Sequence, residues 1–97
     1  MSYPEMQKLI AKLNALAPKG FKLKFDQNTT QVFNSIAKFL NKLDPLSWRR
    51  LFEEFKVNPQ LFSDDLKTIL KHYRHIKANY PGSRMADLSF TLKHQKP

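Results

Sequence analysis

The spacing of hydrophobic residues along the chain predicts four helices. The first begins at Ser2, which together with Glu5 has the spacing of a capping box, and it ends before Pro18. Between these limits apolar residues recur three and four positions apart, as they do on one face of a helix. This apolar stripe consists of Met6, Leu9, Ile10, Leu13 and Leu16.

The second and third helices are predicted from similar stripes. The second helix begins near Thr29, and its stripe runs to Leu43. The third begins at Asp44, an N-cap residue that is followed by Pro45 in the first turn. The apolar edge of this third helix is expected to be buried and consists of Trp48, Leu51, Phe52 and Phe55.

The clearest helical pattern follows Ser63. The Ser63 hydroxyl is an N-cap, and Asp64 and Asp65 complement the positive N-terminal end of the helix dipole. The pattern predicts a single helix that ends before Pro81 and Gly82, a pair that is typical of turns. Its apolar stripe consists of Leu66, Ile69, Leu70, Tyr73 and Ile76.

Two short segments alternate between apolar and polar residues instead, which is the pattern of a strand. They are 21–25, with the sequence FKLKF, and 88–92, with the sequence LSFTL. Two isolated short strands in one small domain are expected to pair with each other. The sequence therefore predicts a mainly α, four-helix bundle-like fold with a two-stranded β ribbon, 21–25 with 88–92. We expect residues 1–97 to form one domain whose last few residues fray.

The composition is that of a folded domain, with one strong feature, its positive charge. The apolar fraction of 41% suffices for one modest core in 97 residues. The chain has no Cys, which excludes disulfides, and no apolar run near the roughly 20 residues of a membrane span. Seventeen Lys and Arg against eight Asp and Glu give a net charge of +9, which attracts polyanions or acidic surfaces.

Residue patterns that enzymes use are scarce. Glycine occurs only at positions 20 and 82, so neither a phosphate-binding loop nor a dinucleotide-binding turn can be built. Most acidic residues lie at helix starts or four residues after an arginine, which leaves only Asp26 and Asp87 without an expected structural role. We therefore expect no catalytic residue and no cofactor, although a small basic nuclease stays open as an alternative.

His72 and His75 have a spacing that can chelate a metal ion on a helix. A metal site needs a third and usually a fourth ligand, no Cys is present, and the remaining histidine, His94, lies near the end of the sequence. We therefore expect no metal site. His75 is instead a candidate for contact with nucleic acid, where its titration would make binding depend on pH.

Basic residues form doublets on the outer faces of three predicted helices and of one predicted strand. In the third helix, Arg49 and Arg50 each have a Glu four residues later, whereas the basic pairs of the other helices lack one. Arg84 follows the turn at Pro81 and Gly82, where backbone amides can help to hold a phosphate. The predicted nucleic-acid-binding residues are Lys67, Lys71, Arg74, His75, Lys8, Lys12, Lys38, Lys42, Lys22, Lys24 and Arg84.

The leading hypothesis is a non-catalytic nucleic-acid-binding domain, for RNA or DNA, in the cytoplasm or in the interior of a host cell if the protein is viral. The alternative is a small adaptor, inhibitor or immunity-type protein that docks on an acidic protein surface. This alternative requires an exposed aromatic anchor, for which Trp48, Phe62 and Tyr80 are the candidates. Attachment to an anionic membrane ranks below both, because the apolar stripes are those that a core requires.

Overall fold

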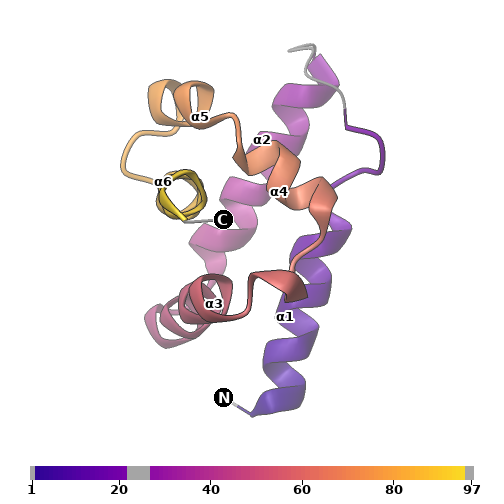
Figure 1. Cartoon of the computed structure of the whole chain (residues 1–97), viewed down its shortest axis with the longest axis vertical. Coiled ribbons are helices and arrows are strands. Elements are labelled where there is room, and N and C mark those ends of the chain that lie inside the picture. Colours follow the sequence, from indigo (N-terminus) through magenta and orange to yellow (C-terminus); the bar gives the residue numbers. More distant parts are fainter. Residues whose placement is uncertain (1, 22–26, 96–97) are drawn as a thin grey trace.

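The computed structural model describes residues 2–21 and 27–95, and in these ranges every regular element is a helix (Figure 1). Six α-helices follow one another along the described chain, with a short 3₁₀ helix between the third and the fourth. The mainly helical class is therefore as predicted. The bounds are α1 (Tyr3–Ala15), α2 (Gln27–Lys42), α3 (Pro45–Val57), η1 (Pro59–Leu61), α4 (Asp64–Leu70), α5 (Tyr73–Asn79) and α6 (Arg84–His94).

Polar residues cap the helices at the starts that the sequence predicts. The Asp44 carboxylate accepts a hydrogen bond from the Ser47 amide of α3 at 3.2 Å, and the Ser63 hydroxyl accepts one from an amide in the first turn of α4 at 3.1 Å. At α1, the Ser2 amide donates to Oε2 of Glu5 at 3.2 Å. The caps at Asp44 and Ser63 satisfy amides that the first turn of a helix leaves without an intrahelical partner. The predicted starts of α1, α3 and α4 are thus confirmed.

The predicted β ribbon is wrong. Segment 88–92 lies within α6, and its expected partner, 21–25, falls outside the described residues except for Phe21, which belongs to no strand. In a strand, Leu88, Phe90 and Leu92 would lie on one face and share one environment. In the structure Leu88 is fully buried, whereas Phe90 is 51% exposed. Helical spacing decides instead which residues face the core. The residues of α6 that are buried are Met85, Leu88 and Ser89.

The single helix predicted after Ser63 is two helices. A bend at Lys71 and His72 separates α4 from α5. At the end of α4, the Leu70 carbonyl accepts a hydrogen bond at 2.5 Å from the hydroxyl of Ser89, a buried residue of α6. A carbonyl that lies in the last turn of a helix thereby finds a partner on another helix. Beyond the bend, α5 packs against α6 (Figure 1).

One apolar core joins the helices. α1 packs on α3 and α4, whereas α6 packs on α2, α3, α4 and α5. Figure 1 views α6 along its axis, with α5 above it and α3 below it. α6 therefore completes the core in place of the expected ribbon. The largest fully buried side chains are Phe33, Phe55, Leu13, Ile36, Leu40, Leu51, Leu66, Ile69, Leu70, Ile76, Met85 and Leu88.

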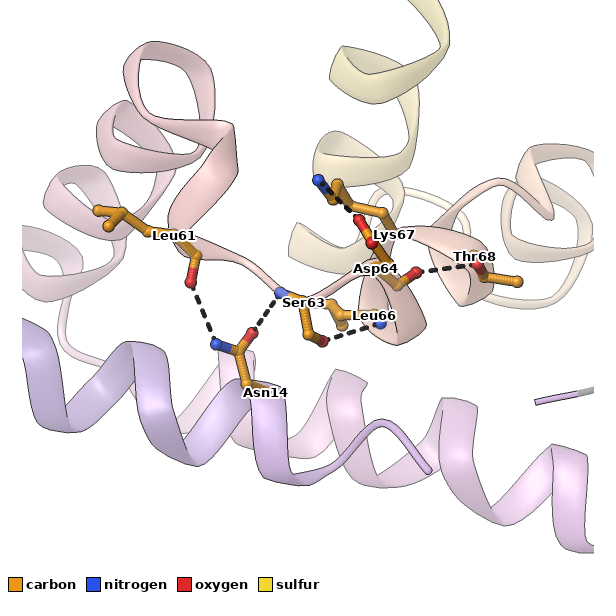
Figure 2. A network of polar contacts seen from close by, with 7 residues as sticks. All are labelled: Asn14, Leu61, Ser63, Asp64, Leu66, Lys67 and Thr68. Carbon is orange, nitrogen blue, oxygen red and sulfur yellow. Dashed lines mark hydrogen bonds and ion pairs between the residues drawn. The ribbon is translucent and has the colours of Figure 1, made fainter. Parts of the chain in front are cut away.

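One polar side chain ties α1 to the connector between η1 and α4 (Figure 2). Nδ2 of Asn14 donates to the Leu61 carbonyl at 3.1 Å, and Oδ1 of Asn14 accepts from the Ser63 amide at 3.0 Å. Just beyond Ser63, Lys67 pairs with Asp64 at 3.4 Å on the surface of α4. These hydrogen bonds hold the start of α4 against α1. They thereby also position the helix that leads to the bend at Lys71 and His72.

Candidate functional site

The bend between α4 and α5 and the last turn of α6 together form a pocket of about 610 Å³. Lys71 lies at the bend, Arg74 lies in α5, and Lys93 lies in the last turn of α6. All three residues are exposed. Leu92 and the Tyr73 ring add apolar surface to the wall, so the pocket combines positive charge with apolar contact area.

A second hollow, of about 520 Å³, adjoins the first and shares Tyr73, Arg74 and Lys93 with it. Its wall also includes Lys77, which lies one turn after Arg74 on α5. We term the two hollows together the α5–α6 cleft. The basic residues of this cleft are Lys71, Arg74, Lys77 and Lys93.

Aromatic rings lie among these cations. Nζ of Lys93 lies 4.5 Å from the centroid of the Tyr73 ring, and Nζ of Lys77 lies 5.8 Å from it. Such cation–π contacts are favourable and hold both lysine side chains close to the cleft. The Phe90 ring of α6 lies 6.1 Å from the Tyr73 ring and 4.3 Å from the His94 ring. Because Phe90 is 51% exposed, an aromatic surface that is open to solvent borders the cleft.

Carboxylates do not line the cleft. Neither hollow has an Asp or Glu in its wall, within the part of the chain that the structure describes. Ion pairs lie on other surfaces, between Lys56 and Glu53 on α3 and between Lys67 and Asp64 on α4. Asp87 is the acidic residue of α6, and partial burial raises its pKa, which disfavours its charged form. The charge in the wall of the cleft is therefore of one sign.

Two histidines connect the cleft to the core. The rings of Phe21 and Phe33 lie 5.8 Å and 6.1 Å from the His72 ring in edge-to-face arrangements. Desolvation by burial lowers the pKa of His72, and the neighbouring His75 adds a smaller effect in the same direction. His75 lines the cleft, and its ring lies 4.8 Å from the Phe33 ring.

The helical trio that the sequence singled out is divided by the bend. Lys71 and Arg74 line the cleft, as does His75. Lys67 lies on α4 and is absent from the wall of the cleft. Its ammonium group pairs with Asp64, and only 23% of its side chain is exposed. The structure therefore brings together two of these three cations.

Arg84 contacts other helices rather than the cleft. Its Nη1 donates to the carbonyl oxygens of Leu40 and Leu43 at 2.6 Å and 2.7 Å, at the C-terminal end of α2. Its guanidinium also lies 5.4 Å from the centroid of the Trp48 ring on α3. A positive charge is favourable at this end of a helix dipole. These contacts engage Arg84 in joining α6 to α2 and α3.

Of the remaining predicted cations, those that the structure describes lie apart from the cleft. Lys22 and Lys24 fall outside the described residues. The lysine pairs of α1 and α2 are exposed, and none of these residues lines either hollow. These exposed lysines are Lys8, Lys12, Lys38 and Lys42.

The aromatic anchors of the alternative hypothesis are partly or fully packed inside. Phe62 is 2% exposed, and its ring centroid lies 5.1 Å from that of Phe55. Trp48 is partly buried and packs against the core. The Tyr80 hydroxyl donates to Oδ1 of Asn34 at 2.5 Å, and burial raises the pKa of Tyr80. None of the three is a freely exposed ring.

Sequence reasoning missed Lys77, Lys93 and Phe90 and assigned Tyr73 to the core. The signal for Lys77 is its spacing, because it follows Tyr73 by four residues and lies on the same side of α5. Lys93 and Phe90 are likewise one helical turn apart on α6. The interpretation of 88–92 as a strand concealed that relation, which a helical interpretation from Ser83 onward would have revealed.

Comparison with protein-family models, with curated proteins and with solved structures gives no match. Across the described residues, no three His, Asp or Glu side chains gather into a set that could hold a metal ion. None of the described helices combines the length and the apolar character of a membrane span. A functional proposal for this chain accordingly depends on the α5–α6 cleft.

Proposed function

We propose that the protein is a non-catalytic nucleic-acid-binding domain that holds RNA or DNA in the α5–α6 cleft through contacts to phosphates. The supporting observation is the convergence of Lys71, Arg74, Lys77 and Lys93 on a cleft without a carboxylate in its described wall. Cations held close together repel one another, and a polyanion relieves that repulsion. The protein would meet such a partner in the cytoplasm, or in the interior of a host cell if it is viral.

Binding through phosphates has a measurable signature. Each phosphate that a Lys or Arg neutralises releases counterions, so the affinity falls as salt rises. The slope of log affinity against log salt is about −0.9 per phosphate on duplex DNA and about −0.7 on single strands. Contacts from all the cleft cations therefore give a slope of roughly −3 to −4.

Fluorescence anisotropy with a labelled oligonucleotide of mixed sequence, measured between about 50 and 200 mM KCl, tests the proposal. A cleft variant is compared with a control variant in which exposed lysines of α1 and α2 are changed, so that both variants lose the same charge. The control carries Lys8→Gln, Lys12→Gln, Lys38→Gln and Lys42→Gln. The cleft variant carries Lys71→Gln, Arg74→Gln, Lys77→Gln and Lys93→Gln.

We expect the cleft variant to flatten the salt slope by about one unit per lost contact, and the control variant to keep most of the wild-type slope. Circular dichroism establishes that each variant is folded. Equal losses in the two variants would assign the affinity to net charge alone and contradict the proposal. Wild-type binding that ignores salt would contradict it as well.

Docking on an acidic protein surface has less support. Phe62, one of its expected anchors, is buried. The exposed residues Tyr3 and Leu46 line a separate hollow between α1 and α3. Two arginines and two glutamates share its wall, namely Arg49, Arg50, Glu53 and Glu54. Because these charges balance, the hollow does not favour an acidic partner. The α5–α6 cleft therefore remains the better candidate for a negatively charged ligand.

A further inference from the structure

We infer that the α5–α6 cleft selects single-stranded nucleic acid and that an unpaired base stacks on Phe90. This inference rests on the proposed function and adds the class of nucleic acid that is bound. Its starting point is the exposure of Phe90, of which 51% is accessible although the residue lies two positions after the fully buried Leu88. A single exposed apolar residue is common, but Phe90 adjoins the cleft cations through Tyr73 and is therefore a candidate contact for a ligand.

Phe90 lies next to the cleft cations through Tyr73. The Phe90 and Tyr73 ring centroids are 6.1 Å apart, and Nζ of Lys93 lies 4.5 Å from the Tyr73 centroid. Lys93 also follows Phe90 by one turn on the same side of α6. A nucleotide whose phosphate contacts Lys93 therefore has its base within reach of Phe90.

The two rings have different roles. The ammonium groups of Lys77 and Lys93 lie over the Tyr73 ring, so Tyr73 orients the cations. Among the described residues, no Lys or Arg lies over the Phe90 ring. The His94 ring lies against Phe90 with its centroid at 4.3 Å, and the 51% of Phe90 that stays exposed is the surface on which a base can stack.

A duplex cannot use this surface. Its base faces are covered by the neighbouring base pairs, whereas a single strand presents them to aromatic side chains. Proteins that bind single strands combine a positively charged groove with such a stacking ring. The α5–α6 cleft provides the groove, and the exposed Phe90 ring lies at its border beside Tyr73. Every base has an aromatic face, so the cleft discriminates by strandedness more than by sequence.

Anisotropy with two probes tests the inference, namely a labelled strand of about 16 nucleotides and the blunt duplex of the same sequence. Phe90→Ala removes the ring, and Phe90→Trp keeps an aromatic surface. Leu46→Ala is the matched control, because Leu46 is 50% exposed and lies on α3 away from the cleft. Phe90 is not part of the buried core, so we expect each variant to fold, and thermal unfolding verifies this.

We expect the wild type to bind the strand roughly ten-fold more tightly than the duplex. Phe90→Ala weakens binding of the strand by roughly 5- to 100-fold and leaves binding of the duplex within about two-fold. Phe90→Trp retains the preference for the strand, and Leu46→Ala behaves as the wild type. The expected loss of affinity therefore affects only the single-stranded probe and only the Phe90→Ala variant.

The two levels of the argument fail differently in this experiment. If the wild type binds duplex and strand equally and Phe90→Ala changes neither affinity, the inference is overturned while the proposed function stands. If neither probe binds at low salt, the proposed function is overturned and the inference falls with it. If Leu46→Ala weakens binding of the strand as much as Phe90→Ala does, the stacking role of Phe90 is overturned.

Discussion

Asn14 joins α1 to a part of the chain that lies 47 to 49 residues further on. Both ends of its side-chain amide are engaged, since Nδ2 donates to the Leu61 carbonyl and Oδ1 accepts from the Ser63 amide. Both hydrogen bonds are partly buried, so water does not fully replace either partner. One side chain therefore holds the approach to α4 in place.

We expect Asn14→Ala to lower the free energy of unfolding by about 1–3 kcal/mol, because it leaves a partly buried donor and acceptor without their partner. In a domain of this size each kcal/mol lowers Tm by roughly 4–8 °C. Thermal unfolding followed by circular dichroism measures the change. Asn41→Ala, at an exposed position of α2, is the control, and equal Tm values for the two variants would show that the bridge is not stabilising.

α6 shows why a short pattern is ambiguous at the level of secondary structure. Residues 88–92 alone fit a spacing of two, but a window that starts earlier shows Met85, Leu88 and Leu92 at helical spacing. The window also contains a cap, because the Ser83 hydroxyl accepts a hydrogen bond from the Ala86 amide at 3.0 Å. A helix accounts for the apolar spacing from Met85 to Leu92 and for the cap at Ser83. A strand accounts only for the alternation within 88–92.

Local signals predict the other elements unequally. α1, α3 and α4 start where predicted because a cap and a long apolar stripe agree there. The bend at Lys71 and His72 contains neither Gly nor Pro, and the Ser89 hydroxyl that binds the Leu70 carbonyl comes from another helix. The same holds for the cleft, since Lys93 meets α5 only through tertiary packing. Contacts between helices decide these features, and no local pattern reports them.

Arg84 offers a test that separates stability from binding, at the junction of α6 with α2. Arg84→Gln removes the guanidinium that donates to the Leu40 and Leu43 carbonyls, and we expect it to lower the free energy of unfolding by about 1–3 kcal/mol. The salt slope of nucleic-acid binding should stay unchanged, because Arg84 does not line the cleft. Thermal unfolding and anisotropy measure the two quantities.

Arg49→Gln, at an exposed position of α3, controls for the loss of one positive charge. It is expected to leave Tm close to that of the wild type. An Arg84→Gln variant with a wild-type Tm and a flattened salt slope would contradict the structural role and assign this arginine to the ligand.

The described molecule measures 38 × 27 × 26 Å, and its cleft has cations but no carboxylate in the described wall, whereas α3 and α4 carry ion pairs. Acidic residues such as Glu5, Asp44 and Asp64 lie at helix starts, whereas four cations share the α5–α6 cleft. A net charge of +9 repels itself, and the folded state withstands that repulsion without disulfides. Any further protonation adds to the repulsion, so acid weakens the fold.

His72 is one residue through which acid is expected to lower the stability of the fold. Desolvation lowers the pKa of His72 below its ordinary value of 6.5, so the unfolded state takes up a proton first as the pH falls. The stability associated with neutral His72 is fully present above pH 6.5 and is lost as the pH falls through the lowered pKa. We expect the wild-type Tm to fall between about pH 7.5 and 5.5, and that of His72→Gln to fall less.

Thermal unfolding at a series of pH values measures this difference. His94→Gln, at an exposed position of α6, controls for the loss of a histidine as such. If His72→Gln showed the same dependence of Tm on pH as the wild type, burial of His72 would not be the cause.

Trp48 is the only tryptophan, and it lies where α3 meets the first residue of α6. Its ring centroid lies 5.3 Å from that of Phe52 and 5.4 Å from the Arg84 guanidinium, and the indole is absent from the walls of the cleft. The chain therefore has a built-in optical probe whose emission follows the docking of its last helix. That signal can be recorded independently of the label on an oligonucleotide, in the same sample.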